Sequence, residues 1–259
     1  MKSEDQAANR ANTSATQQMS EVERATFLSF VDRSFRDMAD MDYIAARVLH
    51  RLGLLPPFLG AANQAVEKYL KAILLYNDVP AKGLGHDLEK GLTRLGNIPN
   101  IDVEIPDDVR RFIKVLNDEG GNRYFEFPME ISGDELLELD RSVWHLRRCA
   151  QRLKSQTGVA WRLPPFKQED VHRFRVRGGY LEKVLATRGV EREQLVWKNF
   201  YYGSRKKRVI SLQRRVEVAN PTHSLNPSIF PLLSRMVDFS KETKAWFKQH
   251  GLGASRPPT

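Results

Sequence analysis

Hydrophobic positions early in the chain recur at spacings of three and four residues, which is the period of an amphipathic α-helix. The first such stripe predicts one long helix that ends at Gly53 with Pro56-Pro57. A second stripe, from Ala62 to Tyr76, predicts another helix. We expect both stripes to face a common core, and the first consists of Phe27, Phe30, Val31, Met38, Met41, Ala45, Val48 and Leu52.

Three further helices follow in the pattern. Leucines from Leu84 to Leu95 predict a short third helix, and Pro106 opens a fourth. Ser132 and Glu135 have the spacing of a capping box and precede a fifth apolar stripe, from Leu136 to Leu153. Five helices with short connections predict a mainly α protein with an up-and-down five-helix bundle.

The pattern changes after residue 155. Apolar and basic residues alternate over residues 172–177, as in a strand, and a helix is expected over 180–187. An aromatic-rich run over 195–202, the turn signal Gly203-Ser204 and alternation over 210–218 predict an antiparallel hairpin. A closing helix is expected from Pro227. These elements predict a small α+β extension.

The expected domains follow from these changes in pattern. Residues 1–20 are polar and read as a disordered tail, and residues 251–259 as a second tail. The helical bundle is expected over 21–155 and the extension over 156–250. No apolar run is long enough to cross a membrane, and the one cysteine, Cys149, agrees with a reducing compartment. The sequence therefore predicts a cytoplasmic protein with no membrane association.

The formal charge of +9 over 259 residues suggests a polyanionic partner, and its distribution sharpens that suggestion. Residues 1–150 carry 19 basic and 24 acidic side chains, a net −5, whereas residues 151–259 carry 22 and 8, a net +14. The excess of positive charge therefore belongs to the extension and not to the bundle.

Residues 39–77, followed by Gly85-His86-Asp87-Leu88 and by Asn122-Arg123-Tyr124, resemble the HEPN domain of bacteria and archaea. The resemblance covers about residues 21–154 and implies a helical bundle that usually dimerises. HEPN domains are known chiefly as metal-independent endoribonucleases of toxin–antitoxin, phage-defence and RNA-processing systems. Nuclease members pair an Arg, as a fixed cation, with a His four to six residues later that moves protons.

Arg123 matches the family Arg by its place in Asn-Arg-Tyr, but no His follows it at that spacing, so the nuclease motif is degenerate. His86 and His145 are the remaining catalytic candidates. His145 lies one helical turn after Arg141, and with Arg148 it falls opposite the apolar stripe of the fifth helix. We expect this face to be a solvated basic surface, with phosphate contact or proton transfer as alternatives. For His86 the alternative is a structural role at a helix start.

The extension brings cations and aromatic rings together, a combination that suits single-stranded nucleic acid. The alternative is that the rings form a small core and the charges only confer solubility. The candidate nucleic-acid-binding residues are Arg173, Arg175, Arg177, Lys198, Tyr201, Tyr202, Arg205, Lys206, Lys207, Arg208, Arg214 and Arg215.

No phosphate-binding glycine loop, Gly-x-Gly-x-x-Gly or His-Glu-x-x-His motif occurs, so no cofactor or metal is expected. The leading hypothesis is a HEPN-family, RNA-directed binding protein that forms a homodimer, in stress or phage defence. One alternative is an active metal-independent endoribonuclease that uses Arg123 with His86 or His145. The other is a regulatory module that binds a nucleotide or a protein partner such as an antitoxin.

Overall fold

The computed structural model describes part of the chain, in two compact units. The first unit is formed by residues 1–117 and 136–210, and the second by residues 118–135 and 211–259. The described residues are 19–98, 101–103, 105–119, 129–131, 134–153, 161–162, 179–203, 216–218, 235 and 244–245. The domain boundaries expected at 155/156 and 250/251 lie outside them.

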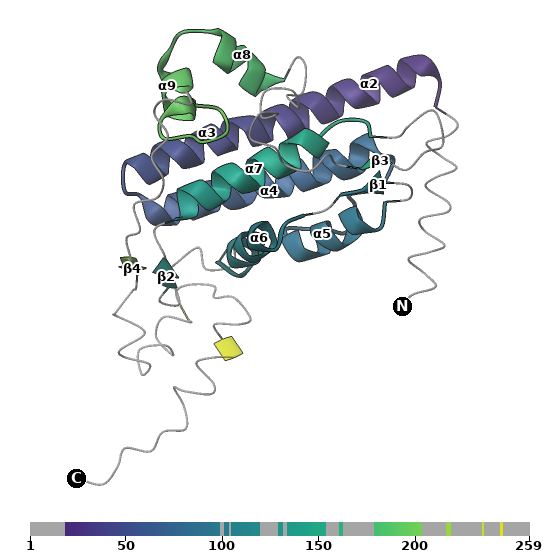
Figure 1. Ribbon diagram of the computed structural model, residues 1–259. Helices are drawn as coiled ribbons and strands as arrows, with labels where there is room; N and C mark the ends of the chain where they lie inside the picture. The colour runs from purple at the N-terminus through teal and green to yellow at the C-terminus, as the bar shows by residue number, and fades with distance from the viewer. Residues whose placement is uncertain are drawn as a thin grey trace, which may run out of the picture. The chain divides into compact units, whose positions relative to one another are not determined.

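The long first helix is confirmed, with one irregularity (Figure 1). It consists of α2 (Glu21–Val31), the π-helical turn η1 (Asp32–Arg36) and α3 (Asp37–Arg51). A capping box that the sequence reading missed starts it. The Ser20 hydroxyl accepts from the Glu23 amide at 3.3 Å, and the Glu23 carboxylate accepts from the Ser20 amide at 2.9 Å.

The predicted core face of this helix is wrong. Val31 is fully buried, but Phe30, Met38, Met41 and Leu52 are exposed. The buried face of α3 instead contains polar and charged residues between small and apolar ones: Ala39, Asp40, Tyr43, Ile44, Ala46 and Arg47. A prediction from hydrophobicity alone could not identify this face, because its buried side chains include charges that are paired inside the protein.

The next helix, α4 (Leu55–Tyr76), packs along α3, and α5 (Leu88–Gly96) packs on α4. Pro56 and Pro57 lie in the first turn of α4, so they start the second helix, and Gly53, with φ of 75°, follows the end of the first. The helix α6 (Asp107–Glu119) begins right after Pro106, as predicted.

The last bundle helix, α7 (Glu135–Cys149), begins at Glu135. The predicted capping box would have started it at residue 133, with Glu135 as the third helical residue. Ser132 lies outside the described residues, so the box itself is not confirmed. Figure 1 shows α3, α4 and α7 running side by side.

Two short helices, α8 (Tyr180–Ala186) and α9 (Val190–Val196), belong to the first unit and pack on α3. The first confirms the helix expected over 180–187, whereas the second was not predicted. Because α8 and α9 share a compact unit with the bundle helices, the expected five-helix bundle is not confirmed, although the protein is mainly helical.

The predicted hairpin is not confirmed. Its first arm was expected over 195–202, but Leu195 and Val196 end α9 and turns follow. The strand β4 (Val216–Val218) pairs antiparallel with β2 (Met129–Ile131) in the second unit. In the first unit, β1 (Ile101–Asp102) pairs in parallel with β3 (Trp161–Arg162). The strand expected over 172–177 and the start of the closing helix at Pro227 lie outside the described residues.

Helices in the described part of the chain are too short or too polar to cross a lipid bilayer.

Candidate functional site

The expected solvated basic face of α7 is mostly buried. Arg141 is exposed and forms an ion pair with Asp108 of α6. His145 and Arg148, one and two turns further on, are only 5% and 4% exposed. The prediction failed because the face opposite the apolar stripe is also covered, with Trp144 stacking on Tyr201 at 5.4 Å between ring centroids.

His145 and Arg148 form a buried pair. The Arg148 guanidinium donates to Nδ1 of His145 at 3.0 Å and lies 3.5 Å from the centre of the Trp144 ring. Burial lowers the pKa of Arg148 to about 10. Burial, with the nearby charges of Arg148 and Arg141, lowers the pKa of His145 to about 3. The imidazole is therefore neutral at physiological pH, which makes it a poor proton donor and a weak base.

His86, the other catalytic candidate, is placed at the start of α5. Its ring is 71% exposed, and Nδ1 contacts the Glu67 carboxylate at 2.9 Å. Lys71 donates to the other oxygen of Glu67 at 2.6 Å. Asp87 caps α5 by accepting from the Lys90 amide at 2.8 Å, as expected for a residue at a helix start. Arg123 lies outside the described residues, so the structure brings no Arg123–His pair together in the part it describes.

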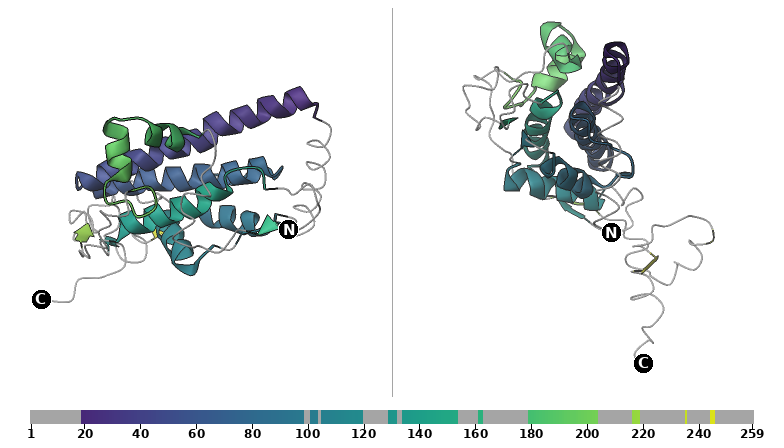
Figure 2. Two further views of the ribbon diagram at one scale, coloured as in Figure 1. Left: turned by 45° about the horizontal axis from the view of Figure 1, so that its top comes forward. Right: turned by 90° about the vertical axis from the view of Figure 1, so that its right-hand side faces the viewer.

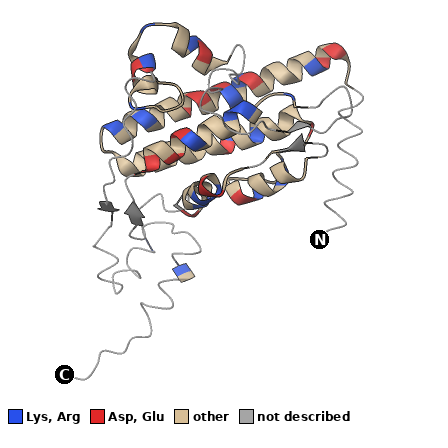
Figure 3. Cartoon of the chain, in the orientation of Figure 1, with Lys and Arg blue, Asp and Glu red and all other residues tan. Residues whose placement is uncertain are grey.

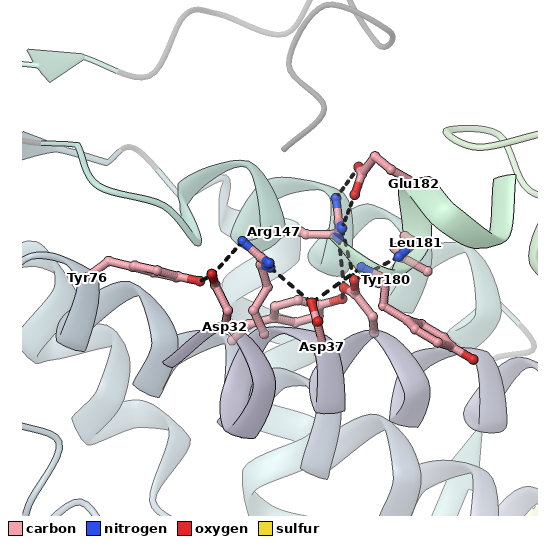
Figure 4. Close-up of polar contacts among 10 residues, drawn as sticks. Asp32, Asp37, Tyr76, Arg147, Tyr180, Leu181 and Glu182 are labelled. Carbon is pink, nitrogen blue, oxygen red and sulfur yellow. Dashed lines mark hydrogen bonds and ion pairs between the residues drawn. The ribbon is translucent and has the colours of Figure 1, made fainter. Parts of the chain in front are cut away.

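A buried ion-pair cluster that was not predicted fastens α8 to the bundle (Figure 4). Asp40 of α3 accepts two bonds from Arg147 of α7, from Nε at 2.7 Å and from Nη2 at 2.9 Å. The same guanidinium donates to both carboxylate oxygens of Glu182, at 2.7 and 2.6 Å. Asp40 also accepts from the Tyr69 hydroxyl at 2.6 Å and from the Leu181 amide at 3.0 Å. One guanidinium thus joins three helices.

A neighbouring chain of contacts extends this cluster. Figure 4 shows Asp37 close to the start of α8, where it accepts from the Tyr180 amide at 3.3 Å. Arg36 donates to the same oxygen of Asp37 at 3.2 Å and pairs with Asp32 at 2.8 Å. Tyr76 donates its hydroxyl to Asp32. The π-helical turn therefore supplies Asp32, which ties α4 to the long helix, and Arg36, which holds the Asp37 carboxylate that α8 contacts.

A second buried cluster fixes α9 and the residues after it. Arg47 of α3 forms an ion pair with Asp140 of α7 and donates to the backbone carbonyls of Gln194, at 3.1 Å, and of Trp197. Tyr43 donates to Asp140 at 2.6 Å and accepts from the Asn199 side chain at 2.8 Å. Residues 179–203 are therefore held by buried charges from both α3 and α7.

These clusters place a partly exposed aromatic ring among cations at the C-terminal end of α3, which we name the Trp197 patch: His50, Arg51, Trp197 and Lys198. The Arg51 guanidinium lies 5.0 Å from the Trp197 ring centre, and the Lys198 ammonium lies 4.9 Å from it. Neither cation forms an ion pair within the described residues. Burial, with Arg47 and Lys198 nearby, lowers the pKa of His50.

Of the predicted nucleic-acid-binding residues, only three lie among the described residues. Lys198 belongs to the Trp197 patch. Tyr201 and Tyr202 are 5% and 6% exposed, and the Tyr202 ring packs 6.2 Å from that of Tyr43. Both rings are therefore buried, as in the alternative interpretation, but they pack against α7 and α3 and not in a separate core of the extension. The others have no described position: Arg173, Arg175, Arg177, Arg205, Lys206, Lys207, Arg208, Arg214 and Arg215.

Two signals could have located the Trp197 patch from sequence. Trp197 and Lys198 lie next to each other, and Arg51 ends the long helix. Nothing in the sequence pattern joins residues so distant along the chain, because the contact depends on the buried clusters.

Among the described residues, no group of three His, Cys, Asp or Glu side chains is placed to hold a metal ion. Both acidic and basic residues are spread along the helices of the first unit, as Figure 3 shows.

The helices and their buried contacts define a compact α-helical domain with a basic, aromatic surface patch. Residues 33–142 match the HEPN domain family, from η1 into α7. The chain therefore carries a HEPN domain, and the resemblance read from the sequence is confirmed. The 179–203 segment lies outside this match, although Asp40, Arg47 and Asp140 inside it hold the segment. No match was found among curated proteins or among solved structures.

The Asp40 cluster predicts a large loss of stability for Asp40→Asn. The amide cannot neutralise Arg147, which stays buried with Glu182 alone, and we expect the free energy of unfolding to fall by about 3 kcal/mol. Urea denaturation measures this. Asp108→Asn is the control, because its ion pair with Arg141 is partly exposed and is worth under about 1 kcal/mol. Equal losses in the two variants would contradict the role of the cluster.

The buried His145 predicts a pH dependence of stability. Its folded pKa lies below the unfolded value, so the unfolded chain binds the extra proton and stability falls as pH drops below about 6.5. Between pH 7 and pH 5 the wild type should lose about 1–2 kcal/mol more than His145→Asn, measured by denaturation at each pH. Parallel pH profiles for the two proteins would show that His145 is not held neutral.

Proposed function

We propose that the protein binds single-stranded RNA, as a homodimer of HEPN chains, through its basic C-terminal part. The observation that carries this proposal is the Trp197 patch. It combines an indole with two cations that form no ion pair within the described residues, at a position fixed by buried contacts.

The patch has the chemistry that unpaired nucleotides require. Cations bind phosphates with release of counterions, and an aromatic face can stack on a base that is not paired in a duplex. Lys198 lies beside the indole, so a base that stacks there would bring its phosphates close to this charge. The net charge of +14 over residues 151–259 extends the same electrostatic preference beyond the patch.

The same residues favour binding over cleavage. Metal-independent cleavage of RNA needs a group that exchanges protons near neutral pH. His145 is buried with a pKa of about 3 and does not supply this group, whereas His86 is exposed and contacts Glu67. Ribonuclease activity therefore remains the alternative function, and it depends on Arg123. A role in stress or phage defence, and a protein partner such as an antitoxin, are predictions from the resemblance alone.

The test is the affinity for a single-stranded RNA oligonucleotide, measured by fluorescence anisotropy at several salt concentrations in EDTA. We expect binding to weaken steeply with salt, and the double variant Trp197→Leu, Lys198→Glu to bind about tenfold or more weakly. A matched control is Leu54→Ala with Lys82→Glu, which alters an exposed apolar residue and an exposed lysine outside the patch. This control should keep wild-type affinity to within about twofold.

Three outcomes would contradict the proposal. Binding that does not depend on salt would exclude phosphate contacts, and equal losses in the patch and control variants would exclude the Trp197 patch. Cleavage of the oligonucleotide in EDTA that disappears in Arg123→Ala would establish the ribonuclease instead.

A further inference from the structure

The outer face of α3 carries an apolar stripe with no partner among the described residues of the first unit. It consists of Met38, Met41, Ala45, Val48 and Leu52, of which Met38, Met41 and Leu52 are 39%, 40% and 66% exposed. The opposite face of α3 is the buried one, with Tyr43 and Arg47 inside. Seen nearly end-on in Figure 2, α2 and α3 form one edge of the first unit.

The spacing of the stripe is three, four, three and four residues, which is the seam of a coiled coil. Its first four residues lie in the regular helix α3 after η1, and Leu52 is the C-cap with helical backbone angles, so the side chains stay on one face. Soluble monomers rarely expose a continuous apolar stripe of this kind, because it would bury favourably against any complementary surface. The spacing selects a second helix as the complementary surface.

We propose that the outer face of α3 is the dimer interface, and that it binds the same face of a second copy of this chain in antiparallel orientation. This inference rests on the homodimer of the proposed function, and it specifies the surface and the register. The charges beside the stripe decide the orientation.

The register follows from placing the apolar positions against one another. In an antiparallel pair centred near residue 43, Met41 faces Ala45 of the second copy and Met38 faces Val48. Large side chains then lie opposite small ones, so the seam can close without voids. The twofold axis repeats both contacts, which is the self-complementarity that a symmetric dimer requires.

The same register brings opposite charges together at both ends of the seam. Asp37 and Arg51 precede Met38 and Leu52 of the stripe, and both flank it on the same side. In the antiparallel pair Asp37 of each copy faces Arg51 of the other. Both contacts that Asp37 makes within the described residues use Oδ1, so Oδ2 points to no described donor. Arg51 is exposed, and within the described residues it donates to the side-chain amide of Gln194 and lies over the Trp197 ring, with no carboxylate partner.

The parallel orientation has no such match, because it would place Asp37 beside Asp42 of the second copy. Like charges in these flanking positions are unfavourable. In the antiparallel orientation the two Asp42 side chains approach each other near the axis. Each is already neutralised by Lys68 of its own chain, so this contact does not oppose association.

A mixing experiment tests the register. Asp37→Lys faces Arg51 twice in its own dimer, and Arg51→Glu faces Asp37 twice, so each variant alone should associate about tenfold or more weakly than wild type. An equimolar mixture restores both opposite-charge pairs and should form a heterodimer with near wild-type affinity. Sedimentation equilibrium of the full chain, without RNA, measures all three.

Crosslinking gives a second reading of the orientation. The native Cys149 is buried, and burial raises its thiol pKa to about 12, so it does not interfere. Chains with Met41→Cys should form disulfides efficiently with chains that carry Ala45→Cys. Neither variant should crosslink efficiently with itself, because the antiparallel register sets each residue opposite the other. Efficient self-crosslinking of both variants would establish the parallel orientation and overturn the proposal.

The apolar seam has its own control. Met41→Glu should leave a monomer, whereas Val190→Glu, at a 71% exposed valine outside the seam, should remain a dimer. A wild-type chain that sediments as a monomer would overturn the proposed interface. Because RNA is absent from these measurements, that result leaves the RNA-binding test at the Trp197 patch to be decided separately.

Discussion

The positions of α8 and α9 in the first unit depend on one constraint, that the carboxylates and guanidinium groups buried between these helices and the bundle must pair. Arg147 meets this constraint by binding Asp40 on one side and Glu182 on the other, with all four carboxylate oxygens engaged by donors. Since Asp40, Arg147 and Glu182 come from three helices, satisfying one guanidinium fixes where α8 packs on the bundle. Arg47 does the same for α9: it pairs with Asp140 and donates to the Gln194 carbonyl of that helix. Both clusters together fix the position of the Trp197 patch.

The paired charges also explain why α3 buries a polar inner face and exposes an apolar outer face. Its inner face buries Asp40, Tyr43 and Arg47 with polar partners, so the strongest hydrophobic positions are not needed there. Met38, Met41 and Leu52 lie on the outer face instead. Because α3 packs within its own domain through ion pairs and hydrogen bonds, its apolar stripe remains exposed and can contact a second copy. The family match covers this helix, whereas the 179–203 segment that it holds lies beyond the match.

The helices were predictable from sequence because periodicity, Pro106 and Gly53 act locally. The buried faces of α4, α6 and α7 were also predictable, but the buried face of α3 was not, since hydrophobicity assigned its exposed stripe to the core and gave no sign of its paired charges. His145 and Arg148 failed for the same reason, because their burial depends on Trp144 and Tyr201, which meet only in the folded chain. Lys198 was found by its charge, but its neighbour Arg51 is brought to it by tertiary contacts and was missed.

The central claim is that buried carboxylates make residues 179–203 an integral part of the HEPN unit. Hydrogen exchange of the Leu181 amide tests it most directly, because this amide donates to Asp40 inside the cluster. We predict protection similar to that of core amides in α4, and loss of protection of both in the same transition as urea is added. Exchange of Leu181 at the rate of an unfolded peptide, while α4 stays protected, would contradict the account.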